Sequence, residues 1–117
     1  TRRDIERWRR LGTAAGDFLA GMTDFYIDAY SATQPELEGC GMHDPLAVAA
    51  ALDPTLVTTL GMNLQVDLEG AYRGRTIGDR AHDRLTDSHK PTQVAVRVDI
   101  ARFKSQFLDR ITALASH

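Results

Sequence analysis

Apolar and charged residues alternate at helical spacing at the start of the chain. Ile5, Trp8 and Leu11 share one face of a helix that we predict over residues 4–11. The arginines of "TRRDIERWRR" lie between them, as is typical of the solvated face of an amphipathic helix. The apolar stripe should therefore be buried in the domain.

A longer helix is predicted next, from Thr13 to about Ala32. Thr13 is a suitable N-cap because its hydroxyl can accept a hydrogen bond from the first turn, and Pro35 ends the helical run. The apolar positions that follow the helical period are Ala14, Phe18, Met22, Phe25 and Ala29.

The loop "ATQPELEGCG" leads to a third, short helix. We expect Asp44 to be its N-cap and Pro45 to take the first helical position, where the missing N–H costs nothing. The helix continues through "LAVAAAL" until Pro54 ends it. Because this segment is almost wholly apolar, it should be buried.

From Val57 onward, alternation of apolar and polar residues replaces the helical period and predicts strands. The first strand includes "LQVDLEG", a second short strand follows a turn at Gly74, and "TQVAVRVD" predicts a third. The apolar residues expected to share a face are Leu64, Val66 and Leu68 in the first strand, and Val94, Val96 and Val98 in the third.

The segment from Asp99 returns to helical spacing. Its apolar positions are Ile100, Phe103, Phe107, Ile111 and Leu114. The predicted order is therefore helices, a few strands and a closing helix, which places the chain in the α/β class.

Composition narrows the kinds of function. The chain has 117 residues, of which 43% are hydrophobic and 26% charged, and this suits one compact domain. A formal net charge of −2 gives no field that would attract nucleic acid. No apolar run is long enough for a bilayer, so we expect no membrane role. Cys40 is the single cysteine, so nothing indicates an oxidising compartment, and we expect a cytoplasmic protein.

His43 and Asp44 are the strongest candidates for chemistry. An aspartate before a proline at a helix start can simply cap the helix, and its neighbouring histidine can be an ordinary loop residue. A carboxylate held at a helix N-terminus also suits a metal ligand, and a histidine beside it can donate a proton near neutral pH. The residues alone leave both interpretations open.

Two further groups in the connection "GDRAHDRLTDSHKP" resemble metal ligands only superficially. Asp79, Asp83 and Asp87 recur every four residues, but the glycine and glutamate of a calcium loop are missing. His82 and His89 have no cysteine partners nearby in sequence. We therefore expect no metal site in this connection.

The segments "GMHDPLAVAAALDP", "VDLEGAYRGRTIGD" and "VAVRVDIARF" together resemble the C-terminal part of the inosine-uridine-preferring nucleoside hydrolases. The resemblance covers essentially residues 1–117, which we interpret as a C-terminal portion of one such domain. It implies an open, Rossmann-like α/β fold and a calcium-dependent enzyme that hydrolyses ribonucleosides to ribose and free base. Asp44 would then be a calcium ligand, and His43 the acid that protonates the departing base.

The same resemblance places an aromatic helix near the base-binding side of the pocket. In "FYIDAY", Tyr26 and Tyr30 lie one helical turn apart, so either can stack on a base or hydrogen-bond to it. We favour Tyr30 because it is nearer the loop. Ordinary core or surface tyrosines remain the alternative.

One family feature is missing from the chain. The resemblance implies an N-terminal aspartate cluster that supplies most calcium oxygens and the catalytic base, but this sequence has no two adjacent aspartates. Calcium takes about six to eight oxygens, so we expect the chain alone to bind calcium poorly and to be inactive. It also starts at Thr1 without an initiator methionine, so it is expected to be a segment of a longer protein.

Two alternatives to a portion of an enzyme remain. The chain can be a non-catalytic domain kept for self-association or for binding a partner, because strands cut from a larger sheet leave unpaired edges. A separate chain can also supply the aspartate cluster, although the sequence shows no such partner. We expect a homo-oligomer with a ribonucleoside as the substrate of the complete enzyme.

Overall fold

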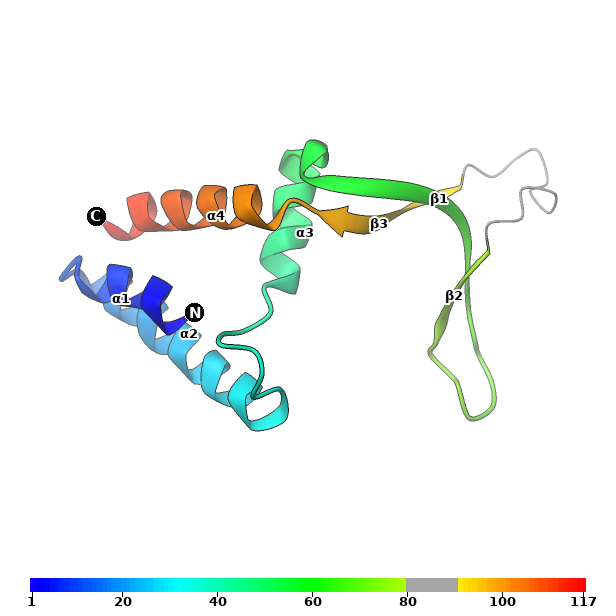
Figure 1. Cartoon of the computed structure of the whole chain (residues 1–117), viewed down its shortest axis with the longest axis horizontal. Helices are drawn as coiled ribbons and strands as arrows, with labels where there is room; N and C mark the ends of the chain where they lie inside the picture. Colours follow the sequence, from blue (N-terminus) through cyan, green and yellow to red (C-terminus); the bar gives the residue numbers. More distant parts are fainter. Residues whose placement is uncertain (80–90) are drawn as a thin grey trace. The chain divides into compact units, whose positions relative to one another are not determined.

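The computed structural model describes residues 1–79 and 91–117, which divide into two compact units. The helical unit comprises Thr1–Pro54 and Ile100–His117, and the strand unit comprises Thr55–Asp99. Each unit is described by itself. The elements in chain order are α1 (Arg2–Arg9), α2 (Ala14–Thr33), α3 (His43–Leu52), a 3-10 turn (Pro54–Leu56), β1 (Val57–Val66), β2 (Thr76–Asp79), β3 (Thr92–Val98) and α4 (Ile100–Ala115) (Figure 1).

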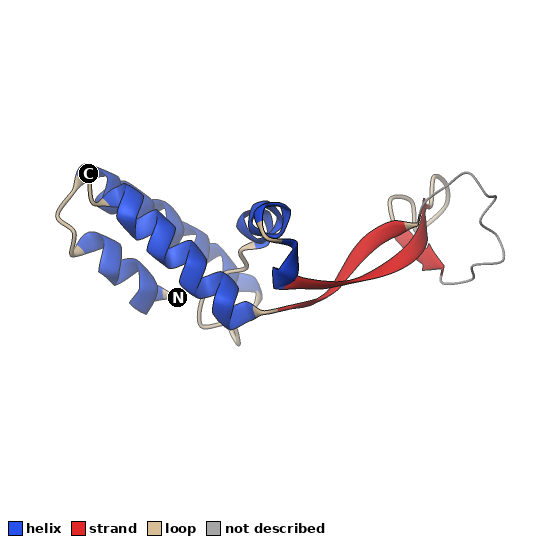
Figure 2. Cartoon of the chain, turned by 90° about the horizontal axis from the view of Figure 1, so that it is seen from above, coloured by secondary structure: helices blue, strands red, loops and turns tan. Residues whose placement is uncertain are grey.

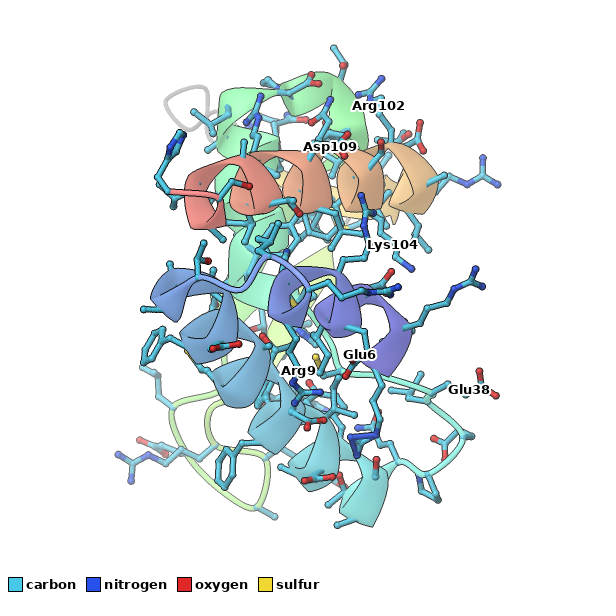
Figure 3. All side chains as sticks on the ribbon, turned by 90° about the vertical axis from the view of Figure 1, so that its left-hand side faces the viewer. Glu6, Arg9, Glu38, Arg102, Lys104 and Asp109 are labelled. Carbon is cyan, nitrogen blue, oxygen red and sulfur yellow. The ribbon has the colours of Figure 1, made fainter. Side chains whose placement is uncertain are left out.

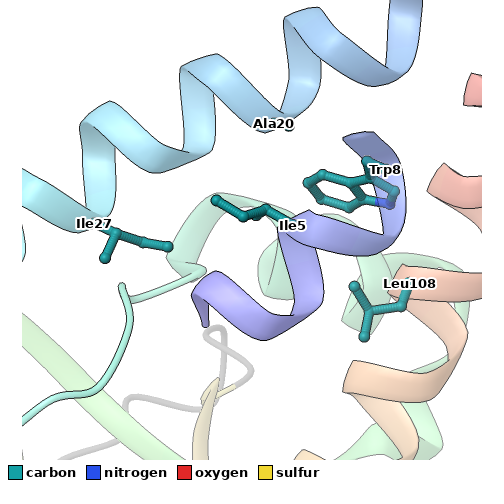
Figure 4. Close-up of a cluster of buried hydrophobic side chains, with 5 residues drawn as sticks. All are labelled: Ile5, Trp8, Ala20, Ile27 and Leu108. Atoms are coloured by element: carbon teal, nitrogen blue, oxygen red, sulfur yellow. The ribbon is translucent and has the colours of Figure 1, made fainter. Parts of the chain in front are cut away.

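The core of the helical unit lies where α1, α2 and α4 come together. Its buried members come from all three helices: Ile5, Trp8, Ala20, Ile27 and Leu108 (Figure 4). The indole Nε1–H of Trp8 donates a hydrogen bond of 3.1 Å to the Thr112 hydroxyl on α4, so the one polar atom of this side chain is paired. The ring of Trp8 also meets Phe107 edge to face, with ring centroids 6.5 Å apart. Trp8 therefore joins α1 to α4.

The prediction of an amphipathic first helix is confirmed. Ile5 and Trp8 are buried and Leu11 packs partly against the core, whereas the arginines of this segment are exposed. The helix begins two residues earlier than predicted because Thr1 and Asp4 form a capping box. Lys104 extends from α4 toward α1 (Figure 3) and its Nζ lies 2.9 Å from the Asp4 carboxylate.

Ion pairs also link α1 to α2 on the solvent side. Arg2 contacts Asp24 and Asp28, each at 2.5 Å, and Arg9 contacts Asp24 at 2.8 Å. Arg9 also pairs with Glu6 on its own helix (Figure 3). The Arg9 hydrogen bond, together with Arg2, lowers the pKa of Asp24. All of these side chains keep access to solvent, so the pairs orient α1 more than they stabilise it.

The second helix forms as predicted, with Thr13 as its N-cap, since the Gly16 amide donates a hydrogen bond of 3.0 Å to the Thr13 hydroxyl. Its buried face, however, consists of Gly16, Ala20 and Ile27. The large apolar residues that predicted the helix, Ala14, Phe18, Met22, Phe25 and Ala29, are all exposed. Small residues form the buried face because α1 approaches closely there: a Cβ on Gly16 would lie 2.5 Å from the Trp8 carbonyl oxygen.

Two predictions about the third helix are wrong. Its N-cap is Met42, not Asp44, so His43, Asp44 and Pro45 form the first turn. Pro45 remains harmless there because N–H groups of the first turn have no partner within the helix. The helix was also expected to be buried, but none of its residues is. No other element of the helical unit covers its apolar side chains, although α4 contacts it.

The strand unit is a three-stranded antiparallel sheet in the order β2-β1-β3 (Figure 2). β1 pairs with β3 through its first half and with β2 through its second half. β1 ends at Val66, so Leu68 is not part of the predicted strand face. The register with β3 shifts between Thr58 and Thr59, and Val96 falls between the paired residues Ala95 and Arg97. Val96 was predicted to share one face of the strand with Val94 and Val98. This bulge interrupts the alternation of side chains on which that prediction depends.

The closing helix is confirmed as α4. The buried residues of α4 are Phe103, Leu108 and Ala115. Ile100 and Leu114, which lie at the two ends of the predicted apolar stripe, are exposed. In the part of the chain that the structure describes, no helix has the length and apolar character required to span a bilayer.

Candidate functional site

His43 and Asp44 are both exposed and occupy the first turn of α3, after the loop that contains Cys40 and Gly41. The first turn is fixed by a hydrogen bond of 3.0 Å from the Leu46 amide to the Met42 carbonyl. A carboxylate at this position is favoured by the positive end of the helix dipole. The local structure therefore presents an imidazole and a carboxylate side by side to solvent.

Gly41 brings Tyr30 next to His43. A Cβ at Gly41 would lie 2.5 Å from Cε1 of His43 and 2.8 Å from the Tyr30 hydroxyl. Both side chains therefore approach the same point of the loop backbone, where an added Cβ would force them to move. The sequence placed Gly41 only in the loop "ATQPELEGCG", and its position two residues before His43 is the one signal that could have indicated this role.

Tyr26 and Tyr30 also form a pair, as their one-turn spacing predicts. Their rings meet edge to face, with centroids 5.1 Å apart and an interplanar angle of 70°. Hydrogen bonding with Tyr30 is the main cause that raises the pKa of Tyr26, with smaller effects from burial and from the charges of Cys40 and Asp44. Neither tyrosine is buried in the core, so both rings keep a surface that a ligand can reach.

Cys40 lies in the same loop but has the character of a packing residue. Burial raises the pKa of its thiol, and its Sγ lies 4.0 Å from Sδ of Met42. The side chain also packs partly against the core cluster. A thiol with a raised pKa carries little thiolate, so the local environment does not activate Cys40 as a nucleophile.

Across residues 1–79 and 91–117, no three His, Cys, Asp or Glu side chains gather where they could hold a metal ion. Asp44 offers at most two of the six to eight oxygens that calcium takes. Asp79 lies at the end of β2, and the other acidic and histidine residues of its connection, Asp83, Asp87, His82 and His89, lie outside the described residues.

The order of helices and strands is that of an α/β domain, and its candidate site is the exposed His-Asp pair at the start of α3. Comparison with known families gives a more specific assignment. Residues 1–105 match the inosine-uridine preferring nucleoside hydrolase family. The chain belongs to that family, which confirms the assignment suggested by the His-Asp-Pro segment.

The chain is similar to nucleoside hydrolases from bacteria and protozoa. A solved purine-preferring ribonucleoside hydrolase from Gardnerella vaginalis matches 99% of this chain and 36% of its own, with 60% identity and a TM-score of 0.89. The inosine-uridine preferring nucleoside hydrolase of Leishmania major is 34% identical over 91% of this chain and 33% of its own length. A pyrimidine-specific ribonucleoside hydrolase from Klebsiella pneumoniae is 30% identical over 96% of this chain and 36% of its own length.

The chain thus spans about a third of the length of the relatives that it matches. This coverage fits the expected C-terminal portion of the α/β nucleoside hydrolase fold.

Proposed function

We propose that this chain is the C-terminal part of a calcium-dependent ribonucleoside N-ribohydrolase, which cleaves the N-glycosidic bond to give ribose and a free base. The observation that carries this proposal is the placement of Tyr30 beside His43 across Gly41, with Asp44 next in the same helical turn. Family membership supports the reaction class. The 60% identity with a purine-preferring enzyme favours a purine ribonucleoside as substrate.

Each residue has a distinct proposed role. His43 donates an imidazole proton to a ring nitrogen of the base as the glycosidic bond breaks, so that the base leaves as a neutral molecule. Tyr30 contacts that base through its ring or its hydroxyl, and Tyr26 supports Tyr30 through the edge-to-face contact. Asp44 supplies one calcium oxygen, and the remaining ligands come from the part of the domain that this chain does not span.

A chimera can test the role of His43. The matching C-terminal part of the Gardnerella vaginalis enzyme is replaced by residues 1–117, and ribose release is measured with inosine, adenosine and uridine. We expect turnover of purine nucleosides, and His43→Ala should lower kcat by about a hundredfold or more, as loss of a general acid does.

A substrate whose leaving group needs no proton separates acid catalysis from structural damage. With a nitrophenyl riboside, His43→Ala should retain most of the activity of the unmodified chimera. An equal loss on both substrates would remove His43 from the role of acid. Addition of a chelator should abolish turnover, and activity that survives chelation would contradict the calcium requirement.

The second candidate function is non-catalytic self-association. The exposed apolar residues of α2 favour it, because such a surface in a free chain associates readily. Light scattering on the 117-residue chain gives the test. A concentration-dependent dimer or larger oligomer, with no contribution to hydrolysis in the chimera, would favour association over catalysis.

A further inference from the structure

A core helix normally turns its bulky apolar side chains toward the core, but most of those of α2 lie on the exposed face. Gly16, Ala20 and Ile27 face the core, and the apolar residues of the exposed face lie about half a helical turn away. Phe18 and Phe25 are 69% and 77% exposed. We call this exposed face the α2 stripe; it consists of Ala14, Phe18, Met22, Phe25 and Ala29.

Ion pairs hold two of the acidic side chains beside the stripe. Asp24 and Asp28 of α2 are held in ion pairs with Arg2 of α1, and Arg9 adds a second contact to Asp24. These pairs neutralise part of the acidic flank of α2, whereas Asp17 in the first turn is exposed. The stripe therefore has the composition of a surface that packs against another apolar surface.

A similar uncovered surface exists on α3. Val48 and Leu52 lie one helical turn apart and are 62% and 68% exposed. A helix that is apolar around its whole circumference is normally buried, yet no residue of α3 is buried here. The α2 stripe and this α3 pair thus require a cover that the helical unit does not contain.

The relatives indicate what this cover is. The Gardnerella vaginalis enzyme contains the whole of this fold within 36% of its chain, at a TM-score of 0.89, so about two-thirds of that chain lies outside the match. One partner of that size accounts for α2 and α3 together. The α3 helix also carries His43 and Asp44, so the same partner borders the candidate site.

We propose that the α2 stripe and the α3 pair Val48 and Leu52 form the docking surface for the other two-thirds of a nucleoside hydrolase domain, and that this surface binds that part even as a separate chain. The proposal rests on membership of the family and on the exposed apolar faces. It does not require the catalytic roles given above to be correct.

Co-expression tests the docking directly. The 117-residue chain is tagged and expressed with the unmatched part of the Gardnerella vaginalis enzyme, and the purified material is analysed by light scattering. We expect a one-to-one complex. Phe25→Glu should weaken it at least about tenfold, because a charge would be buried in an apolar contact. Tyr72→Glu, at an aromatic residue of similar exposure in the strand unit, should leave the complex intact.

A second measurement does not depend on separate folding of the two parts. Hydroxyl-radical oxidation of Met22 is compared in the 117-residue chain and in the single-chain chimera, since this thioether is half exposed in the free chain. We expect oxidation to slow at least about tenfold in the chimera because the docked part covers the stripe. Equal oxidation in both proteins would overturn the proposal, as would a homodimer of the free chain that protects Met22 and excludes the other part.

The two readouts keep docking separate from catalysis. Protection of Met22 without nucleoside hydrolysis would support docking and contradict the proposed function. Hydrolysis without protection of Met22 would support the proposed function and contradict docking. The α2 stripe would then face solvent or a second copy of the chain.

Discussion

The Tyr30 hydroxyl and the His43 imidazole approach the same backbone position: a Cβ at Gly41 would lie 2.8 Å from one and 2.5 Å from the other. Tyr30 belongs to the end of α2 and His43 to the start of α3, so the two helices bring these side chains to the same point of the loop. The loop between them must keep its backbone close to both side chains. Its glycine is therefore as important to the site as the residues that carry chemistry.

Gly41→Ala should lower activity with little effect on folding. The added methyl group would push the His43 ring and the Tyr30 hydroxyl away from their positions, and a displacement of this size in a catalytic group costs roughly tenfold to a hundredfold in rate. The measurement is kcat and KM of the chimera for a purine nucleoside. Gly21→Ala, where no atom lies within 4 Å of the new Cβ, is the matched control and should retain full activity. Unchanged kcat in Gly41→Ala would show that the contact has no part in catalysis.

Two glycines of α2 should respond in opposite directions when changed to alanine. Gly16→Ala places a Cβ 2.5 Å from the Trp8 carbonyl oxygen, and this overpacking should destabilise the chain by about 1–3 kcal/mol. Gly21→Ala meets open space in a helix interior and should stabilise it by about 0.5–1 kcal/mol. Urea denaturation gives both values. A stable Gly16→Ala variant would mean that α1 does not pack against α2 as described.

Thr112→Val should show how much the hydrogen bond between Trp8 of α1 and Thr112 of α4 contributes to the free energy of unfolding. The Trp8 side chain is 3% exposed, so loss of the Thr112 acceptor leaves a buried N–H without a partner and costs about 1–3 kcal/mol. The free energy of unfolding is measured for Thr112→Val, for Trp8→Phe and for the double variant. Additive losses in this cycle would show that the two side chains do not interact. Thr58→Val, at an exposed position of β1, is the control.

Asp4→Asn should remove a stabilisation that depends on pH. Partial burial acts to raise the pKa of Asp4, but hydrogen bonds from the Thr1 hydroxyl and Lys104 outweigh it and lower the pKa. Because the pKa of Asp4 is lower in the folded state than in the unfolded state, its ionised carboxylate stabilises the fold. This stabilisation is fully present when the pH is above the unfolded-state pKa of about 3.9, and it is lost as the pH falls toward the folded-state pKa.

The difference in unfolding free energy between Asp4→Asn and the unmodified chain should therefore be about 1 kcal/mol or less at neutral pH and shrink below about pH 4. Thermal unfolding at a series of pH values provides the measurement. Glu38→Gln, at an exposed loop position, serves as the control. A constant difference from pH 7 to pH 2 would contradict a role for the Asp4 charge.

The order of elements and the family could be predicted from sequence because both depend on local patterns. Thr13 caps α2 whatever the fold around it, since its hydroxyl and the Gly16 amide are three residues apart. Likewise, Tyr26 and Tyr30 meet because a helix places residues four apart on one face. The segment that begins with His43 and Asp44 indicated the family, and the comparison confirmed it.

Only the tertiary structure decided which side of α2 and α3 is covered. The periodicity of α2 fits its exposed stripe as well as a buried one, and α1 packs on the opposite face because Gly16 and Ala20 allow the two backbones to approach. The α3 helix, though apolar after His43 and Asp44, has no buried residue in this chain. The approach of Tyr30 and His43 to Gly41 depends on the path of a loop between two helices, which no local pattern encodes. The sequence by itself thus determined the order of the elements, the Thr13 cap of α2 and the family. Packing between distant segments determined the buried faces of α2 and α3 and the geometry of the candidate site.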